Sequence, residues 1–245
     1  MQRTTTNAPN HALQRTATPV TVHAPSRRSH PRRVSAWPAP GSAVAELGVV
    51  SRCYPSPVND MTTSPTSTQF FELWVQTCTT QFVTLYRDWP NPPVFTADIL
   101  SGPTSVMGVI ETQLGLHGYS NYYHIDEILY ADQDLVPGIP VGQVWVRRIR
   151  VAFEHENFFL SGLFQEVSHL LITDCDLRVL VSYPGNDAEL NYQLQYLHSI
   201  VAGSDRASTV AASQSFLFIV GWRDTTKGTI EWWGYVYEPT TWRRI

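Results

Sequence analysis

Residues 149–183 read IRVAFEHENFFLSGLFQEVSHLLITDCDLRVLVSY, and this stretch decides the fold. Its beginning belongs to a run from Gln143 to Phe153 that is rich in β-branched and aromatic residues, which predicts a strand. A helix is expected from Phe164 to Ile172, because the apolar residues there recur at helical spacing. Leu177 to Tyr183 is almost continuously apolar, which is typical of a strand buried on both faces of a sheet. The stretch therefore predicts a strand, a helix and a second strand.

The flanking sequence extends this pattern in both directions. Before the stretch, helical spacing predicts a helix of about twenty residues from Phe71, stopped by Pro90, and a shorter one over 106–114, with a strand over 122–130. After it, a helix is expected near 188–201 and strands over 215–222 and 229–237. We therefore predict an α/β fold with a mixed central β-sheet flanked by helices.

Composition and charge divide the 245 residues into two parts. Residues 1–60 hold seven arginines and two acids, a net charge of +5, whereas residues 61–245 carry a net charge of −9. No apolar run approaches the ~20 residues of a membrane-spanning helix. The three cysteines, unevenly spaced, exclude a disulfide-stapled scaffold and a zinc knuckle and fit a reduced compartment. We expect a single α/β domain over 61–245 in a cytoplasmic protein that does not contact a membrane.

Residues 1–60 show neither helical nor strand periodicity, so we predict a disordered or spurious leader. A spurious leader would arise by translation upstream of the natural start, which we place at Met61. Two alternatives are a basic nucleic-acid-binding arm, from the arginines at 27, 28, 32 and 33, and an organelle transit peptide.

Paired carboxylates mark the end of the first strand. Glu154 and Glu156 alternate with His155, so both acids point to one face of the sheet and the histidine to the other. Two neighbouring acids repel each other, and a bound divalent cation usually offsets this repulsion. Asp126, in the preceding strand, supplies a third acid if the two strands pair. The alternative is that these strand-end acids are simply solvated.

The same segment is similar to a known superfamily. Val151–Asn157, then Glu166–Leu171, then Leu177–Tyr183, resembles the order of motifs in bacterial members of the PD-(D/E)XK superfamily, the restriction-endonuclease-like nucleases. The resemblance covers residues 68–185 and implies a restriction-endonuclease-like core. One position departs from the pattern, since Glu156 stands where the family usually has lysine.

The resemblance implies a metal-dependent nuclease. Asp126, Glu154 and the backbone carbonyl of His155 would bind Mg²⁺, or Mn²⁺ in its place. Glu156 would orient or deprotonate the attacking water. Gln165 or Glu166, at the start of the next helix, would steady the water or a phosphate.

Charge bears on the partner that such a site would need. Binding of DNA or RNA is driven largely by basic residues, and Arg148 and Arg150, which share a face, are the local candidates for nucleic-acid binding in the acidic part of the chain. The alternative function is a catalytically silent domain for protein interaction or oligomerisation. It would form a homo-oligomer through an aromatic C-terminal sheet, whose residues are Trp222, Trp232, Trp233, Tyr235, Tyr237 and Trp242.

Overall fold

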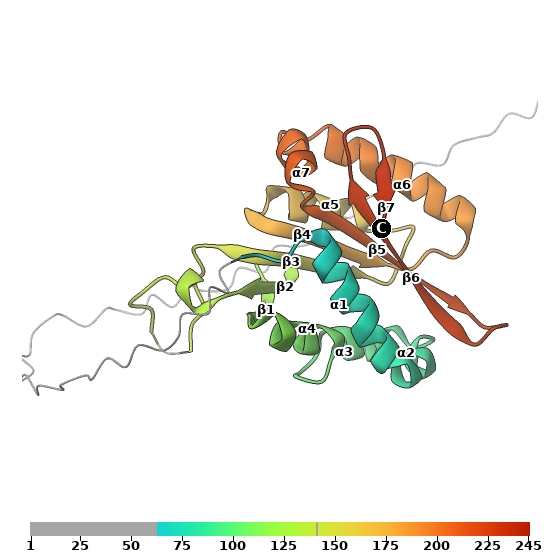
Figure 1. The fold of residues 1–245 in the computed structure, drawn as a ribbon, viewed down its shortest axis with the longest axis horizontal. Coiled ribbons are helices and arrows are strands. Elements are labelled where there is room, and N and C mark those ends of the chain that lie inside the picture. Colours follow the sequence, from blue (N-terminus) through green and yellow to red (C-terminus); the bar gives the residue numbers. More distant parts are fainter. Residues whose placement is uncertain (1–62, 141) are drawn as a thin grey trace, which may run out of the picture. The chain divides into compact units, whose positions relative to one another are not determined.

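The computed structural model describes residues 63–140 and 142–245. The expected leader, residues 1–60, lies outside the described residues. The described part is built on one seven-stranded sheet whose strands follow one another in chain order (Figure 1). The strands are β1 (His117–Tyr122), β2 (Ile125–Tyr130), β3 (Ile149–Glu156), β4 (Cys175–Ser182), β5 (Phe216–Asp224), β6 (Thr229–Tyr237) and β7 (Trp242–Arg244).

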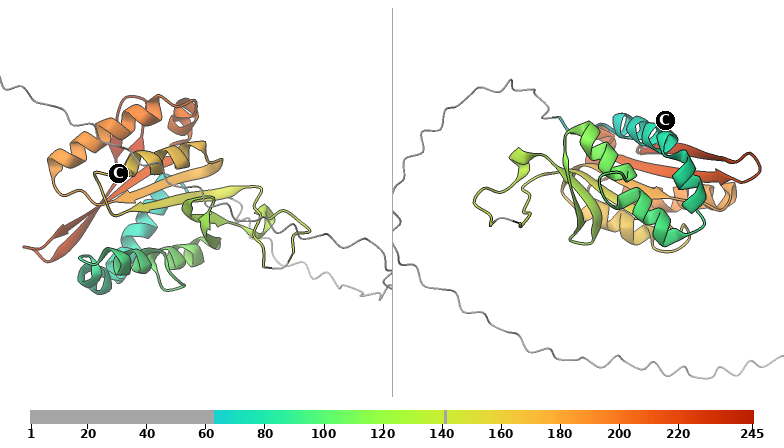
Figure 2. Two further views of the ribbon diagram at one scale, coloured as in Figure 1. Left: turned by 180° about the vertical axis from the view of Figure 1, so that it is seen from behind. Right: turned by 90° about the horizontal axis from the view of Figure 1, so that it is seen from below.

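The sheet is mixed. β3, β4 and β5 pair in parallel at its centre, and β1, β2, β6 and β7 are added by antiparallel pairing on either side. Helices cover both faces (Figures 1 and 2). The expected α/β class with a mixed central sheet flanked by helices is thus confirmed.

The helices divide between the two faces. One layer holds α1 (Ser67–Thr80), α2 (Phe82–Asp88), α3 (Pro92–Leu100) and α4 (Val106–Leu114), and the other holds α5 (Leu163–Ile172), α6 (Asp187–Ala202) and α7 (Ala207–Ser213). A short 3₁₀ helix, η1, spans Asp132–Asp134. No helix among the described residues is long and apolar enough to cross a bilayer.

Strand β4 is the centre of the core. Val179 and Val181 pack into the cluster beneath α1–α4, whereas Leu180 packs into the cluster beneath α5–α7. All three side chains are fully buried. The strand expected over Leu177–Tyr183 is therefore confirmed as buried on both faces.

Several expected elements differ in their bounds. The long helix expected from Phe71 is two helices, α1 and α2, which meet at Gln81, and α3 follows with two prolines in its first turn, where a missing N–H costs nothing. The strand expected over 122–130 is a hairpin, because the chain turns at Tyr123 and His124. The strand expected from Gln143 begins only at Ile149; before it, Val146 makes one isolated bridge to Leu135.

Candidate metal centre

Asp126 and Glu154 are brought together by the pairing of β2 with β3. The register joins Glu127 to Phe153, so Asp126 lies beside Glu154 across the strand pair. The Asp126 N–H donates to Glu154 Oε2 at 3.2 Å, and the His155 N–H donates to Asp126 Oδ2 at 2.8 Å. Neighbours at alternate positions, Ile128 and Ala152, belong to the core beneath α5, so both carboxylates lie on the α5 face.

Helix α5 adds two further groups to this face. His169 Nδ1 lies 3.7 Å from Glu154 Oε1 and 3.4 Å from Glu166 Oε2. The three side chains place one potential ligand atom each within 4.8 Å of one another. Glu166 and His169 share one side of the helix at spacing i, i+3, while Leu163, Val167 and Leu170 anchor the helix to the sheet.

Two buried atoms of the cluster have no hydrogen-bond partner among the described residues. They are Glu154 Oε1 and His169 Nδ1. The Glu154 residue is only 1% exposed. Burial, and after it the charges of Asp126 and Glu166, raise the pKa of Glu154 from 4.5 to about 9. An ionised Glu154 thus requires a positive partner.

Glu156 lies on the same face, at the end of β3. Its Oε1 accepts a hydrogen bond of 2.6 Å from the Phe158 N–H, and its backbone carbonyl accepts one of 2.6 Å from Ser182 Oγ. Burial raises the pKa of Glu156, and the charges of Glu166 and Asp126 contribute in the same direction. Gly162, which precedes α5 with φ of 93°, leaves room for this carboxylate, since a Cβ there would lie 3.0 Å from Glu156 Oε2.

The His155 side chain points away from the cluster, as strand alternation predicts. Its Nε2 lies 2.6 Å from the Tyr183 hydroxyl, and its ring packs near Phe95 beneath α3. Burial lowers the pKa of His155 to about 3, so the imidazole is neutral at pH 7. The only contribution that His155 can make to the carboxylate face is through its backbone.

The structure does not bring Gln165 to the cluster. Gln165 is exposed on α5, and Glu166, the next residue, occupies the place near Glu154. Because successive helical positions lie about 100° apart, only one of the two side chains can face the sheet. The role predicted for the start of this helix therefore passes from Gln165 to Glu166.

The expected nucleic-acid contact through Arg150 requires correction. Arg150 is 3% exposed, and its Nε and Nη2 donate to the two oxygens of Asp134 at 2.6 and 2.9 Å. A buried guanidinium needs such a partner and is closed to a phosphate. Arg148 keeps an exposed side chain but pairs with Asp176 at 2.8 Å. Arg150 also lies four residues, about 13 Å along the strand, from Glu154.

Two histidines of the region were not assigned to the site from the sequence. His169 follows Glu166 at helical spacing, which is a signal that the sequence contains. His124 reaches the site through the β1–β2 turn, where its φ is 72° and its ring stacks on that of His169 with centroids 6.5 Å apart. No local pattern predicts that contact, because it depends on how the hairpin meets α5.

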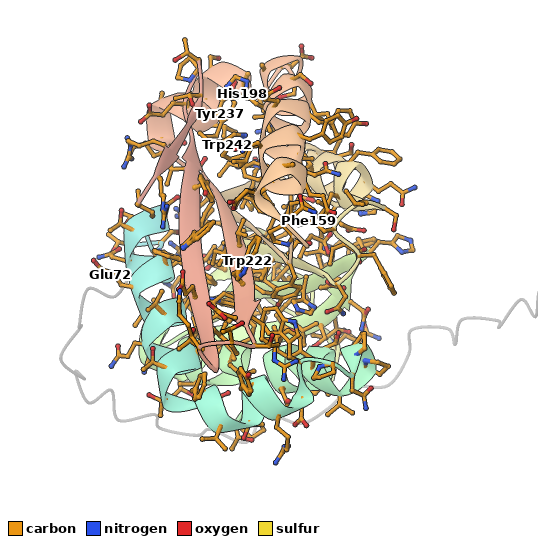
Figure 3. All side chains as sticks on the ribbon, turned by 90° about the vertical axis from the view of Figure 1, so that its right-hand side faces the viewer. Glu72, Phe159, His198, Trp222, Tyr237 and Trp242 are labelled. Atoms are coloured by element: carbon orange, nitrogen blue, oxygen red, sulfur yellow. The ribbon has the colours of Figure 1, made fainter. Side chains whose placement is uncertain are left out.

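Three of the six aromatic residues expected to form the oligomer surface belong to the core. Tyr235, Tyr237 and Trp242 are all less than 10% exposed, and Trp242 Nε1 donates to the Leu194 carbonyl at 2.8 Å. His198, Tyr237 and Trp242 gather between α6 and the C-terminal strands (Figure 3). Trp222, Trp232 and Trp233 are only partly buried, so the expected homo-oligomer contact stays a prediction.

Comparisons of the chain with protein-family models, with curated proteins and with solved structures found no match.

Proposed function

We propose that the protein is a nuclease that hydrolyses phosphodiester bonds of nucleic acid with the help of Mg²⁺ or Mn²⁺. One observation carries the proposal: Glu154 is buried among Asp126, Glu166 and His169 with an unpartnered carboxylate oxygen. Burying such a group without a counter-charge costs several kcal/mol, by a rough estimate. A divalent cation supplies that counter-charge.

The donor set fits this class of ion. Asp126, Glu154 and Glu166 offer carboxylate oxygens, which suit Mg²⁺ and Mn²⁺, and the imidazole of His169 favours the softer Mn²⁺ of the two. When bound, such an ion lowers the pKa of a coordinated water and neutralises charge that develops on a phosphate. The unpartnered Glu154 Oε1 and His169 Nδ1 are the atoms that would gain most from it.

Glu156 is the residue best placed to handle a proton. It lies on the carboxylate face and is only partly buried. Its pKa is raised, and so lies closer to neutral pH than the pKa of an ordinary glutamate. A base with such a pKa can accept a proton from water and later release it. Its Oε1 is fixed by the Phe158 N–H, which leaves Oε2 for that task.

The order of the elements supports the resemblance to restriction-endonuclease-like nucleases. An acid on β2, a Glu-x-acid motif at the end of β3, helix α5 and the apolar strand β4 follow in the sequence that the resemblance implies. The convergence of the carboxylates also favours a working site over the alternative of a silent interaction module. We propose, on these grounds, a restriction-endonuclease-like core.

Calorimetric titration with Mg²⁺ and Mn²⁺ tests the site. The wild type is expected to bind, Glu154→Ala is expected to lose the heat of binding, and Asp205→Ala, which removes an exposed acid elsewhere, is expected to bind as the wild type does. Cleavage of single-stranded and duplex DNA and of RNA is measured in parallel.

Glu156→Lys is the sharper variant, because it restores the residue usual in the superfamily. It is expected to retain or raise cleavage, whereas Glu154→Ala abolishes it. If neither the wild type nor Glu156→Lys cleaves any of these substrates with any divalent ion, and no heat of binding appears, the proposal fails and the silent module is preferred.

A further inference from the structure

A second feature lies at the same edge of the sheet as the carboxylates. A pocket of about 350 Å³ opens at the carboxyl ends of the three parallel strands. Its lining includes Asn157, which follows β3, Tyr183, which follows β4, and Trp222 and Arg223 in the last part of β5. In open α/β sheets, ligands bind outside the carboxyl ends of the strands. The volume falls at the small end of the range for ligand pockets.

The walls of the pocket are largely aromatic. Trp89 and Phe95 come from the α1–α4 layer, and each packs edge-on or tilted against Tyr183, with ring centroids 4.8 and 5.3 Å apart. Gly221 allows the close approach of the Tyr183 ring, because a Cβ there would lie 2.7 Å from it. The Tyr183 hydroxyl is held 2.6 Å from His155 Nε2. These contacts fix the rings before any ligand arrives.

Among the described residues that line the pocket, one is charged, and it is a cation. Arg223 lines the pocket, and its Nε is buried without a hydrogen-bond partner among the described residues. Its guanidinium lies over the Tyr86 ring, 4.3 Å from the centroid. The amide of Asn157 is oriented by its Nδ2, which donates to Thr96 Oγ1 at 2.7 Å. A planar ligand that carries an acceptor or a negative charge would satisfy Arg223.

The pocket and the metal centre are joined by the backbone at the end of β3. Asn157 follows Glu156 directly, and Tyr183 follows Ser182, whose hydroxyl donates to the Glu156 carbonyl. Consecutive Cα atoms are about 3.8 Å apart, so the two features adjoin along the chain. They face opposite sides of the sheet, because the carboxylates lie on the α5 face and Tyr183 packs beneath α1–α4. Trp222 lies on the last part of β5 (Figure 3), and its ring stacks on that of Trp233, with centroids 6.0 Å apart. The aromatic wall beneath α1–α4 is therefore formed by Trp89, Phe95 and Tyr183.

We infer that this pocket binds an unpaired nucleobase, and that the substrate of the proposed nuclease is therefore a single-stranded nucleic acid. Aromatic walls stack on the faces of a base, which are accessible only when the base leaves the duplex stack. The net charge of −9 over residues 61–245 and the burial of Arg150 disfavour a site that depends on many phosphate contacts. The inference rests on the proposed function where it says that the strand is cleaved, but the binding of a base in the pocket does not depend on it.

Binding is measured by calorimetry on the full chain, with a chelator present so that no cleavage occurs. The probes are a short single-stranded oligonucleotide, an abasic strand of the same length and the same sequence as a duplex. The single strand is expected to bind at least tenfold more tightly than either control probe. Equal affinity for the single strand and the abasic strand would overturn the inference.

Variants locate the binding. Trp89→Leu and Arg223→Gln are each expected to weaken binding of the single strand roughly tenfold, which is the scale of one stacked base. Trp145→Leu, which removes a tryptophan that is 62% exposed on a loop outside the pocket, is the matched control and is expected to change nothing. Thermal unfolding of each variant checks that it is folded, and Arg223→Gln remains informative if Trp89→Leu does not fold.

Glu154→Ala separates this inference from the proposed function. It is expected to lose the heat of metal binding while it keeps the affinity for the single strand, and Trp89→Leu is expected to do the reverse. A wild type that binds the strand but neither binds metal nor cleaves would refute the nuclease and leave the base pocket standing. Undiminished binding in both Trp89→Leu and Arg223→Gln would refute the pocket.

Discussion

Glu154 shows how far a folded environment moves a carboxyl group from its ordinary behaviour. Its pKa is raised to about 9 by burial first and then by the charges of Asp126 and Glu166. A group whose pKa is higher in the folded than in the unfolded chain binds more protons when folded. The contribution of Glu154 to the free energy of unfolding is therefore fully present below pH 4.5 and is lost as pH rises towards 9.

Other groups act in different pH windows. Burial raises the pKa of Glu127 to about 7, so its contribution is lost by that pH. Burial lowers the pKa of His155 to about 3. In the unfolded chain this histidine takes up a proton below about pH 6.5, so it destabilises the fold only at acid pH. Of these three groups, Glu154 is the one whose contribution to stability changes between pH 7 and 9.

We predict that the melting temperature of the metal-free protein falls between pH 7 and 9, and that Glu154→Gln removes most of this fall. The free energy of unfolding changes by at most about 1.4 kcal/mol per pH unit for one proton. Glu127→Gln is the matched control and should leave the fall in place. Thermal melts in a chelator provide the measurement, and an identical fall in wild type and Glu154→Gln would refute the assignment.

At the scale of elements, strand β4 joins the two halves of the core. Leu180 is fully buried and packs beneath α5–α7. We predict that Leu180→Asp prevents folding, because an unpaired buried charge is among the few single changes that cost more than about 4 kcal/mol. Ile172→Asp, at an exposed position of α5, should leave the melting temperature almost unchanged. A cooperatively folding Leu180→Asp protein would show that the strand is not central.

The start of α5 couples an element boundary to the site. Gly162 has φ of 93°, and a Cβ there would lie 3.0 Å from Glu156 Oε2. We predict that Gly162→Ala lowers stability by about 1–2 kcal/mol and also weakens metal binding, since the new methyl displaces Glu156. Gly138 has φ of 81° with no atom near the position of a Cβ, so Gly138→Ala should cost stability without changing the metal titration. Equal metal affinities in the two variants would show that Gly162 has no influence on the metal site.

At the scale of the whole molecule, the first described residues already contribute to the fold. Ser64 donates a hydrogen bond to Asp176, and Thr66 caps α1 through a capping box with Gln69. The hydroxyl of Ser67 donates to the Gln214 carbonyl. The domain boundary therefore cannot lie after these residues.

We predict that a chain beginning at Met61 melts at the same temperature as the full chain, because residues 1–60 have no periodic apolar face to bury. A chain beginning at Gln69 should melt several degrees lower, since loss of the helix cap alone costs about 1 kcal/mol. Calorimetric melts of the three chains decide the matter. A lower melting temperature for the Met61 chain would place part of residues 1–60 in the folded unit.

The sequence by itself determined the elements whose signal is local. Strand β4 is apolar on both sides, and α4 and α5 repeat their apolar residues at helical spacing. These spacings indicate a strand or a helix whichever part of the chain the element packs against. It also placed Glu154 and Glu156 on one face, because strand alternation is a property of the backbone. The short elements β1, α7 and β7 were not predicted, since few residues carry too weak a pattern. Helix α3 is as long as α4 but was missed, because its apolar residues do not gather on one face.

Only the tertiary structure decided which side chains meet. The register of β2 on β3 put Asp126 beside Glu154, the docking of α5 chose Glu166 over Gln165, and Asp134 withdrew Arg150 from the surface. Each of these contacts joins residues that are more than ten positions apart along the chain. Such pairs are selected by packing and by the cost of leaving a buried charge unpaired, and no local pattern in a sequence records either of them.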